Sequence, residues 1–360
     1  MNIPQLRIGN LIATTPIVQG GMGVRISLAS LAAAVAQEGG IGTISSIGLG
    51  DFDASHGDYE RVSREALRQE IRKARAMTSG VLAVNFMGVL RNVEELIQTA
   101  VSEGIQMIVF GAGLPMRLPK IVEDASVNLV PIVSSARGAE LILRGWEKRF
   151  DRTASAIILE GPLAGGHLGF TPEQLEHLPD FSLESLIPEA VEAVKPFEDR
   201  FSHAIPVLAA GGIFNGRDIA RMLSLGASGV QMATRFVCTQ ECDAAQAFKQ
   251  TYLDAKEEDI VIVKSPVGLP GRAIRNRFLK DLEKVDRLSI HCLYHCLTVC
   301  KVAEAKFCIA QALLNACQGD IDHGLIFCGQ NAHRIHEIVT VKELMSELRD
   351  ELQAALNEQM

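Results

Sequence analysis

The sequence has 360 residues, of which 48% are hydrophobic and 22% charged, and its 35 basic and 43 acidic side chains give a net charge of −8. The composition is typical of a globular protein, and one α/β barrel with an insertion would account for the length. The negative charge and the lack of a lysine- or arginine-rich run argue against a nucleic-acid partner. No signal peptide or apolar run of about 18 residues is present, so we expect a cytoplasmic protein without a membrane partner.

Short β-branched runs alternate with helical patterns along the first two-thirds of the chain. The helical patterns include Ser27–Gln37, Arg61–Met77, Val93–Ser102, Arg137–Lys148 and Gly216–Leu225. Such alternation indicates parallel strands joined by helical crossovers. The predicted strands are Pro16–Gln19, Gly40–Ile44, Val81–Asn85, Met107–Phe110, Leu129–Val133, Ala156–Leu159, Ile205–Ala209 and Gly229–Met232.

Each predicted strand is followed by a polar or glycine-rich loop. Examples are Gly20-Gly21-Met22-Gly23 after the first strand, Ser45-Ser46 after the second and Gly211-Gly212 after the seventh. A barrel gathers all eight loops around one mouth, whereas an open doubly wound sheet spreads them along a crevice. We therefore predict a TIM (β/α)8 barrel of class α/β, with one site at its mouth.

The β-α alternation stops after Thr234, and about a hundred residues follow before a last amphipathic pattern at Val341–Leu356. We predict a barrel over residues 1–238 and a smaller inserted helical cap with a cysteine-rich segment over 239–320. Residues 321–360 are predicted to return to the barrel and form its final helix. The loop Lys264–Gly271, rich in turn-forming residues, lies within the predicted cap.

Two loops near the end of the predicted barrel indicate a phosphate site. Gly211-Gly212 follows the seventh strand, and Gln231-Met232-Ala233-Thr234 ends the eighth. Barrel enzymes frequently hold phosphate at these loops, on glycine amides and a helix amino terminus. Either loop alone could be a tight turn, but the pair favours a phosphate-bearing cofactor. No G-x-G-x-x-G follows the first strand, which argues against a Rossmann fold.

A histidine lies in the glycine-rich loop after the sixth strand. Glu160 ends this strand, and Gly165 and Gly166 directly precede His167. A histidine titrates near neutral pH, so it can take a proton from a carbon acid or hold an anion. A loop histidine is often structural, but His167 is the best candidate for a catalytic base in this chain.

These motifs together resemble the flavin-dependent nitronate monooxygenases, formerly called 2-nitropropane dioxygenases, and the related FMN-dependent enoyl-acyl-carrier-protein reductases. The resemblance spans nearly the whole chain. It is carried by Pro16–Met22, Gly39–Ile44, Val84-Asn85, Glu160-Gly161 with Ala164–His167, Ala209–Ile213, Gln231–Phe236 and Phe327–Gln330.

The resemblance implies FMN as the cofactor and His167 as the catalytic residue. The implied FMN-binding residues are Gln19, Gly20, Gly21, Met22, Asn85, Glu160, Gly165, Gly166, Gly211, Gly212, Gln231, Met232, Ala233 and Thr234. As a nitronate monooxygenase, the protein would pass electrons from an alkyl nitronate through FMN to dioxygen, leaving a carbonyl compound and nitrite. Alternatively, NAD(P)H would reduce FMN for an enoyl thioester or a quinone, or the barrel would bind flavin without catalysis. The sequence leaves open whether the protein forms a homodimer.

Four cysteines form the pattern C-x3-C-x3-C-x7-C at Cys292, Cys296, Cys300 and Cys308. On a helix the first three would share one face. Four thiolates could bind zinc or an iron–sulfur cluster, but the spacing differs from common sites, and cysteine also packs as a small hydrophobic residue. We favour packing and no metal. We further expect reduced thiols without disulfides, with Cys238, Cys242, Cys317 and Cys328 in the core.

Overall fold

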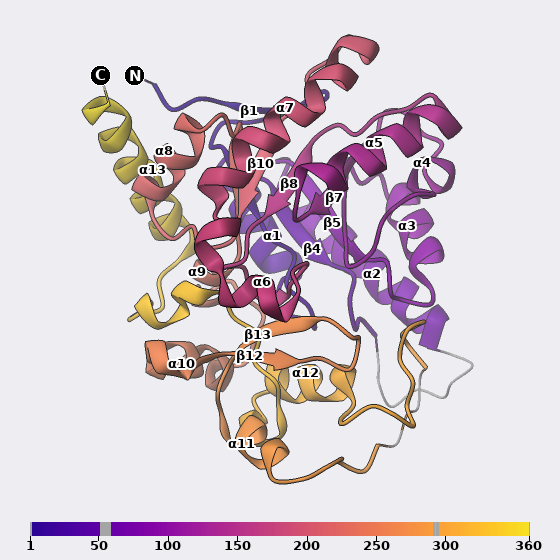
Figure 1. The fold of residues 1–360 in the computed structure, drawn as a ribbon, viewed down its shortest axis with the longest axis vertical. Helices are drawn as coiled ribbons and strands as arrows, with labels where there is room; N and C mark the ends of the chain where they lie inside the picture. Colours follow the sequence, from indigo (N-terminus) through magenta and orange to yellow (C-terminus); the bar gives the residue numbers. More distant parts are fainter. Residues whose placement is uncertain (1, 51–58, 291, 293–294, 360) are drawn as a thin grey trace.

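The computed structural model describes residues 2–50, 59–290, 292 and 295–359. Its centre is an eight-stranded parallel sheet in the order β3-β11-β10-β8-β7-β6-β5-β4 (Figure 1). A parallel bridge between Val18 and Ile41 links the two ends of this order and closes the barrel. The predicted TIM-barrel fold is therefore confirmed. The strands are β3 (Ile17–Gln19), β4 (Gly42–Ser45), β5 (Leu82–Met87), β6 (Met107–Gly111), β7 (Asn128–Val133), β8 (Ile157–Glu160), β10 (Val207–Ala210) and β11 (Gly229–Met232).

A hairpin that the sequence analysis did not predict closes the amino-terminal end of the barrel. Its strands are β1 (Leu6–Ile8) and β2 (Leu11–Ala13), whose alternate residues are buried. These residues pack against side chains inside the barrel, among them Met107, Val130 and Ile158. The interior of the barrel is thus a packed core, and the opposite end remains for a site.

Helices cover the outside of the barrel. They include α1 (Ala29–Gln37), α2 (Tyr59–Met77), α3 (Val93–Ser102), α4 (Leu118–Ile121), α5 (Ala136–Phe150), α7 (Leu183–Phe201) and α8 (Gly216–Ser224). The last helix, α13 (Val341–Glu358), packs against α8 and α1 and completes the helical layer. The chain between β11 and α13 is therefore an insertion into the eighth β-α unit.

The insertion contains strands as well as helices. It holds α9 (Thr234–Val237), α10 (Gln246–Asp254), β12 (Ile260–Lys264), β13 (Pro270–Ile274), α11 (Arg277–Glu283) and α12 (Ile309–Gln318). Strand β9 (Gly166–His167), from the barrel, pairs antiparallel with β13 to make a three-stranded sheet with β12. The histidine loop, which continues into α6 (Pro172–Glu176), is thus built into the insertion, which lies at one end of the barrel (Figure 1).

The cysteine-bearing segment is not the helix that its spacing suggested. Residues 292 and 295–300 have no helical structure, and α12 begins only after Cys308. Leu297 instead forms an antiparallel bridge with Leu90, and the amide of Arg91 donates to the carbonyl of Cys296 over 3.0 Å. Pairing with the loop after β5 therefore overrides the local helical pattern.

The other four cysteines lie in the core, as predicted. All eight cysteines are free, and Cys238, Cys242, Cys317 and Cys328 are buried. Within the described ranges, no three histidine, cysteine, aspartate or glutamate side chains are arranged to hold a metal ion. No helix in the described part of the chain is long and apolar enough to span a bilayer.

Candidate active site

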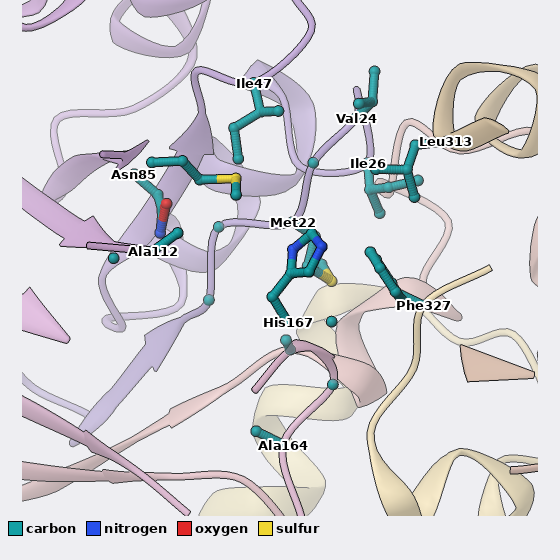
Figure 2. A pocket seen from close by; sticks show the side chains of 18 of the residues that line it. Met22, Val24, Ile26, Ile47, Asn85, Ala112, Ala164, His167, Leu313 and Phe327 are labelled. Carbon is teal, nitrogen blue, oxygen red and sulfur yellow. The ribbon is translucent and has the colours of Figure 1, made fainter. Parts of the chain in front are cut away.

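A cavity lies at the carboxyl ends of the barrel strands, between the barrel loops and the insertion. The volume open to the centres of water molecules is about 280 Å³. Figure 2 shows side chains from both parts around it, including Asn85 and Met22 from the barrel and Leu313 from the insertion. The cavity is lined by Gly20, Gly21, Met22, Asn85, Glu160, Gly165, Gly166, His167, Gly211, Gly212, Gln231, Met232, Ala233 and Thr234 from the predicted site.

Gln19 is the one predicted site residue that does not line the cavity. Its side chain is fully buried behind the first loop. Its Oε1 accepts a hydrogen bond of 3.0 Å from the amide of Thr43, and its Nε2 donates to the carbonyl of Gly20. Gln19 therefore fixes the loop that carries Gly20 and Gly21 from behind.

The loops after β10 and β11 form a glycine-lined end of the cavity. Gly211 and Gly212 have φ values of +94° and +81°, a conformation that disfavours any residue with a Cβ. A Cβ on Gly212 would also lie 2.9 Å from Cδ1 of Leu163. The Nδ2 of Asn331 donates to the carbonyl of Gly212 over 2.7 Å and fixes the turn. Because both residues are glycines, backbone atoms and not side chains form this wall of the cavity.

This end has the free hydrogen-bonding groups that FMN requires. Among the described residues, the amides of Gly212, Ile213 and Thr234 donate to no protein acceptor. The buried Oε1 of Gln231 likewise lacks a donor within the described chain. Unpaired amides suit a phosphate, and a buried amide oxygen suits an N–H of a flavin ring. These residues therefore fit FMN.

His167 lies at the edge of the cavity, on β9. Its Nε2 is 2.7 Å from the hydroxyl oxygen of Ser265, and its ring meets that of Phe327 edge to face at a centroid distance of 5.0 Å. Burial lowers the pKa of His167 to about 4. The imidazole is therefore neutral at physiological pH, and the contact with Ser265 leaves Nδ1 available to another partner.

Glu160 is the acidic group of the cavity, at the carboxyl end of β8. Burial raises the pKa of its carboxyl group to about 7. A carboxyl group with this pKa is partly protonated at neutral pH and can donate a hydrogen bond. The cavity thus combines a neutral imidazole with a carboxylic acid close to its titration point.

Arg272 holds the histidine loop, although nothing in the sequence analysis pointed to it. Its side chain is buried on β13, and its Nη1 donates to the carbonyls of Pro162 and Ala164 over 2.7 and 2.6 Å. Burial lowers the pKa of this guanidinium below its ordinary range. Ser265 and Phe327 were not among the predicted site residues either, although Ser265 lies in the turn-rich loop Lys264–Gly271 and Phe327 in a segment that carries the resemblance.

The chain matches the sequence model of the nitronate monooxygenase family over residues 6–351. It belongs to this family. The members are flavin-dependent oxidoreductases, so the predicted family and the predicted enzyme class are confirmed.

Two curated relatives of this nitronate monooxygenase family member carry different names. A "probable nitronate monooxygenase" of Staphylococcus aureus is 27% identical over 306 residues, covering 75% of this chain and 78% of that protein. A protein of Mycobacterium tuberculosis, named a methyl-oxo-octahydroindene carboxyl-CoA dehydrogenase, is 28% identical over 272 residues. That alignment covers 76% of this chain but 66% of the relative, just under two-thirds of its length.

Two solved structures of similar fold carry different names. FabK from Thermotoga maritima superposes with a TM-score of 0.73 at 26% identity, covering 96% of this chain and 94% of FabK. The nitroalkane oxidase of Streptomyces ansochromogenes has a TM-score of 0.75 at 21% identity, covering 98% and 99% of the two chains. At that identity the second comparison supports the fold alone.

Proposed function

We propose that this protein is an FMN-dependent nitronate monooxygenase, which oxidises alkyl nitronates with dioxygen to carbonyl compounds and nitrite. The observation that carries the proposal is the neutral imidazole of His167, half-buried at the edge of a cavity whose glycine end fits FMN. In this proposal the barrel, residues 1–238, holds the cofactor, and residues 239–320 cap it.

The cofactor-binding roles follow from the groups that each residue offers. The free amides of Gly212 and Thr234 would hold the phosphate, and Gln231 would accept from the flavin ring. Gly21 lets the first loop pack against Asn85, because a Cβ there would lie 2.3 Å from Cβ of Asn85. FMN, when bound, supplies the electron transfer from substrate to dioxygen.

The pKa of His167 favours a nitronate over a neutral nitroalkane as the substrate. An imidazole with a pKa of about 4 is a weak base for removing a carbon-bound proton. A nitronate has already lost that proton, and its oxygens can accept a hydrogen bond from a neutral imidazole. His167 would then bind and orient the anion, while Ser265 holds the ring at Nε2.

Reduction of an enoyl thioester by NAD(P)H is the second candidate function. It is supported by FabK at 26% identity and by the relative named as a carboxyl-CoA dehydrogenase. NAD(P)H-dependent quinone reduction would use the same cavity. The alternative of a flavin-binding protein without activity has no support, since the family consists of enzymes.

Anaerobic stopped-flow mixing separates the two candidates on one optical signal, the bleaching of the flavin. We expect a yellow protein that releases FMN, and not FAD, on denaturation. Alkyl nitronate should bleach the flavin and yield nitrite in air, while NADPH bleaches it slowly or not at all. Fast bleaching by NADPH, reoxidation by an enoyl thioester and no nitrite from nitronates would instead establish the reductase. A colourless protein that FMN cannot reconstitute would overturn the flavin site itself.

A further inference from the structure

The cavity has a second end, which differs chemically from the glycine-lined end. It lies between the loops after β3 and β4 and helix α12 of the insertion. In Figure 2, Val24, Ile26 and Leu313 group on one side of the imidazole of His167, and Ala164 lies on the other. His167 and the aliphatic side chains of this second end therefore line the same cavity.

Aliphatic side chains line this second end, which we call the apolar chamber. Val24 is buried and packs with Ile47, Ala310 and Leu313 in one hydrophobic cluster. This cluster joins the barrel to the insertion, so the chamber exists only because α12 covers the barrel mouth. The chamber is defined by Val24, Ile26, Ile47, Ile309, Ala310 and Leu313.

No cation lines the cavity in the described part of the chain. The lining includes no lysine or arginine, and its ionisable side chains are Tyr59, Glu160, His167, Tyr252, Cys296 and Cys328. Arg25 lies between Val24 and Ile26 in the sequence, but its Nε donates to the carbonyl of Gly48 over 3.0 Å, and it does not line the cavity. A carboxylate or phosphate buried in the chamber would therefore lack a counter-charge, which is costly.

We propose that the apolar chamber binds the uncharged aliphatic chain of the substrate and makes chain length the basis of its selection. This inference rests on the proposed function, because it places the nitronate group beside His167 and directs the alkyl chain toward α12. Short nitronates leave the chamber empty, and nitronates with a charge at the far end of the chain bring an unpaired ion into it. The preferred substrate is thus a nitronate of a longer unbranched alkane.

A series of primary alkyl nitronates from propyl to octyl tests the proposal through nitrite release. We expect kcat/KM to rise about fourfold per methylene, the equivalent of burying one CH2 group, until the chamber is filled. A hexyl nitronate with a carboxylate at its far end should fall below propyl nitronate. Equal kcat/KM across the series, or a preference for the carboxylate, would overturn the proposal.

A binding measurement separates this proposal from the proposed function. Unreactive n-alkyl carboxamides of the same lengths are titrated into the FMN-bound protein, and the shift of the flavin spectrum gives Kd. Kd should fall about fourfold per methylene even if no nitronate is oxidised. Failure of every nitronate to bleach the flavin would count against the proposed function alone, whereas flat Kd values would count against the chamber.

Two variants change the chamber in opposite ways. Leu313→Asp places a charge in it and should flatten the dependence of Kd on chain length. Ala310→Phe fills it and should shift the preference toward propyl compounds, so a folding defect in one variant leaves the other as a test. Leu141→Asp is the matched control, because Leu141 is 52% exposed on α5 and lies outside the cavity. An unaltered chain-length dependence in both chamber variants would refute the proposal.

Discussion

His167 and Ser265 are 98 residues apart in the sequence, and their side chains meet at 2.7 Å. The contact joins the barrel loop after β8 to the hairpin β12–β13 of the insertion. The strand pairing of β9 with β13 holds the two backbones together, with His167 opposite Gly271. The position of the candidate catalytic ring therefore depends on the insertion as much as on the barrel.

We predict that Ser265→Ala impairs turnover without releasing the flavin. Loss of the hydrogen bond to Nε2 frees the imidazole to reorient, and one such bond contributes about 1 kcal/mol, equivalent to roughly fivefold in kcat/KM. The change should appear in kcat more than in KM if Ser265 acts by positioning the ring. Ser126→Ala, which removes a surface hydroxyl bonded to Asp124, is the control and should leave both constants unaltered. Loss of FMN from Ser265→Ala would contradict a positioning role.

Replacement of His167 itself should distinguish binding of an anion from removal of a proton. His167→Asn should retain FMN, since the side chain is not one of the groups that would hold the phosphate. If the imidazole binds and orients the anion, turnover of preformed nitronate should fall roughly ten- to hundredfold, since a hydrogen bond to a charged group contributes about 1.5–3 kcal/mol. Turnover of a neutral nitroalkane should fall no further than that, because an imidazole with a pKa of about 4 is a weak base. A loss of about two to four powers of ten confined to the neutral nitroalkane, the usual contribution of a positioned base, would show instead that His167 removes the proton.

Gly212→Val should cost most of the bound flavin. The residue has a φ of +81°, and its new Cβ would lie 2.9 Å from Cδ1 of Leu163, so the loop must shift and its free amide with it. Gly104→Val is the matched control, because Gly104 has a φ of +74° with nothing within 4 Å of a Cβ. Both variants bear similar backbone strain, but only the first should lose FMN, measured as the ratio of flavin to protein absorbance. Stoichiometric FMN in Gly212→Val would show that the phosphate binds elsewhere.

The barrel could be predicted from the sequence because its strands are local features. Runs such as Val81–Asn85 and Leu129–Val133 are β-branched, buried on both faces and bounded by glycine or polar residues. The hairpin of β1 and β2 escaped prediction because strands of three residues carry little periodicity. All but one of the predicted site residues line one cavity, since strand ends of a barrel converge whatever the details of its loops.

What the sequence analysis missed depends on contacts between distant segments. Ser265, Arg272 and Phe327 reach the site through pairing of the insertion with the histidine loop, which no local pattern encodes. The helical arrangement that the cysteine spacing suggested is absent over residues 295–300 for the same reason, because residues 296–298 pair with the loop after β5. Spacing of cysteines alone cannot distinguish a helical face from such a docked segment.

Metal analysis of the protein purified without oxygen tests the interpretation of these cysteines. Burial raises the pKa of Cys296 to about 12 and also raises the pKa values of Cys300 and Cys308. Among the described residues, these thiols are not arranged to hold a metal ion. We therefore expect neither zinc nor iron in stoichiometric amount. A stoichiometric metal that is lost when Cys296 and Cys300 are replaced by serine, but retained in Cys242→Ser, would establish a thiolate site instead.

The stability of the protein should depend on pH through Glu160. Its folded-state pKa of about 7 exceeds the ordinary value of 4.5, so the fold favours the protonated acid. The associated stability is fully present below about pH 4.5 and is lost as the pH rises through about 7. Glu160→Gln keeps a neutral side chain at every pH, and its urea midpoint should exceed that of the unmodified protein by an amount that grows from about pH 5 to about pH 8.

The matched control for Glu160→Gln is Glu189→Gln, on the exposed face of α7, which should shift the urea midpoint equally at all these pH values. His167 contributes with the opposite sign: its pKa of about 4 lies below the ordinary 6.5, so its contribution is lost as the pH falls between these values. The double variant Glu160→Gln/His167→Asn should therefore have a flatter pH profile on both sides. A difference between Glu160→Gln and the unmodified protein that stays constant with pH would mean that the carboxylate is ionised and solvated in the folded state.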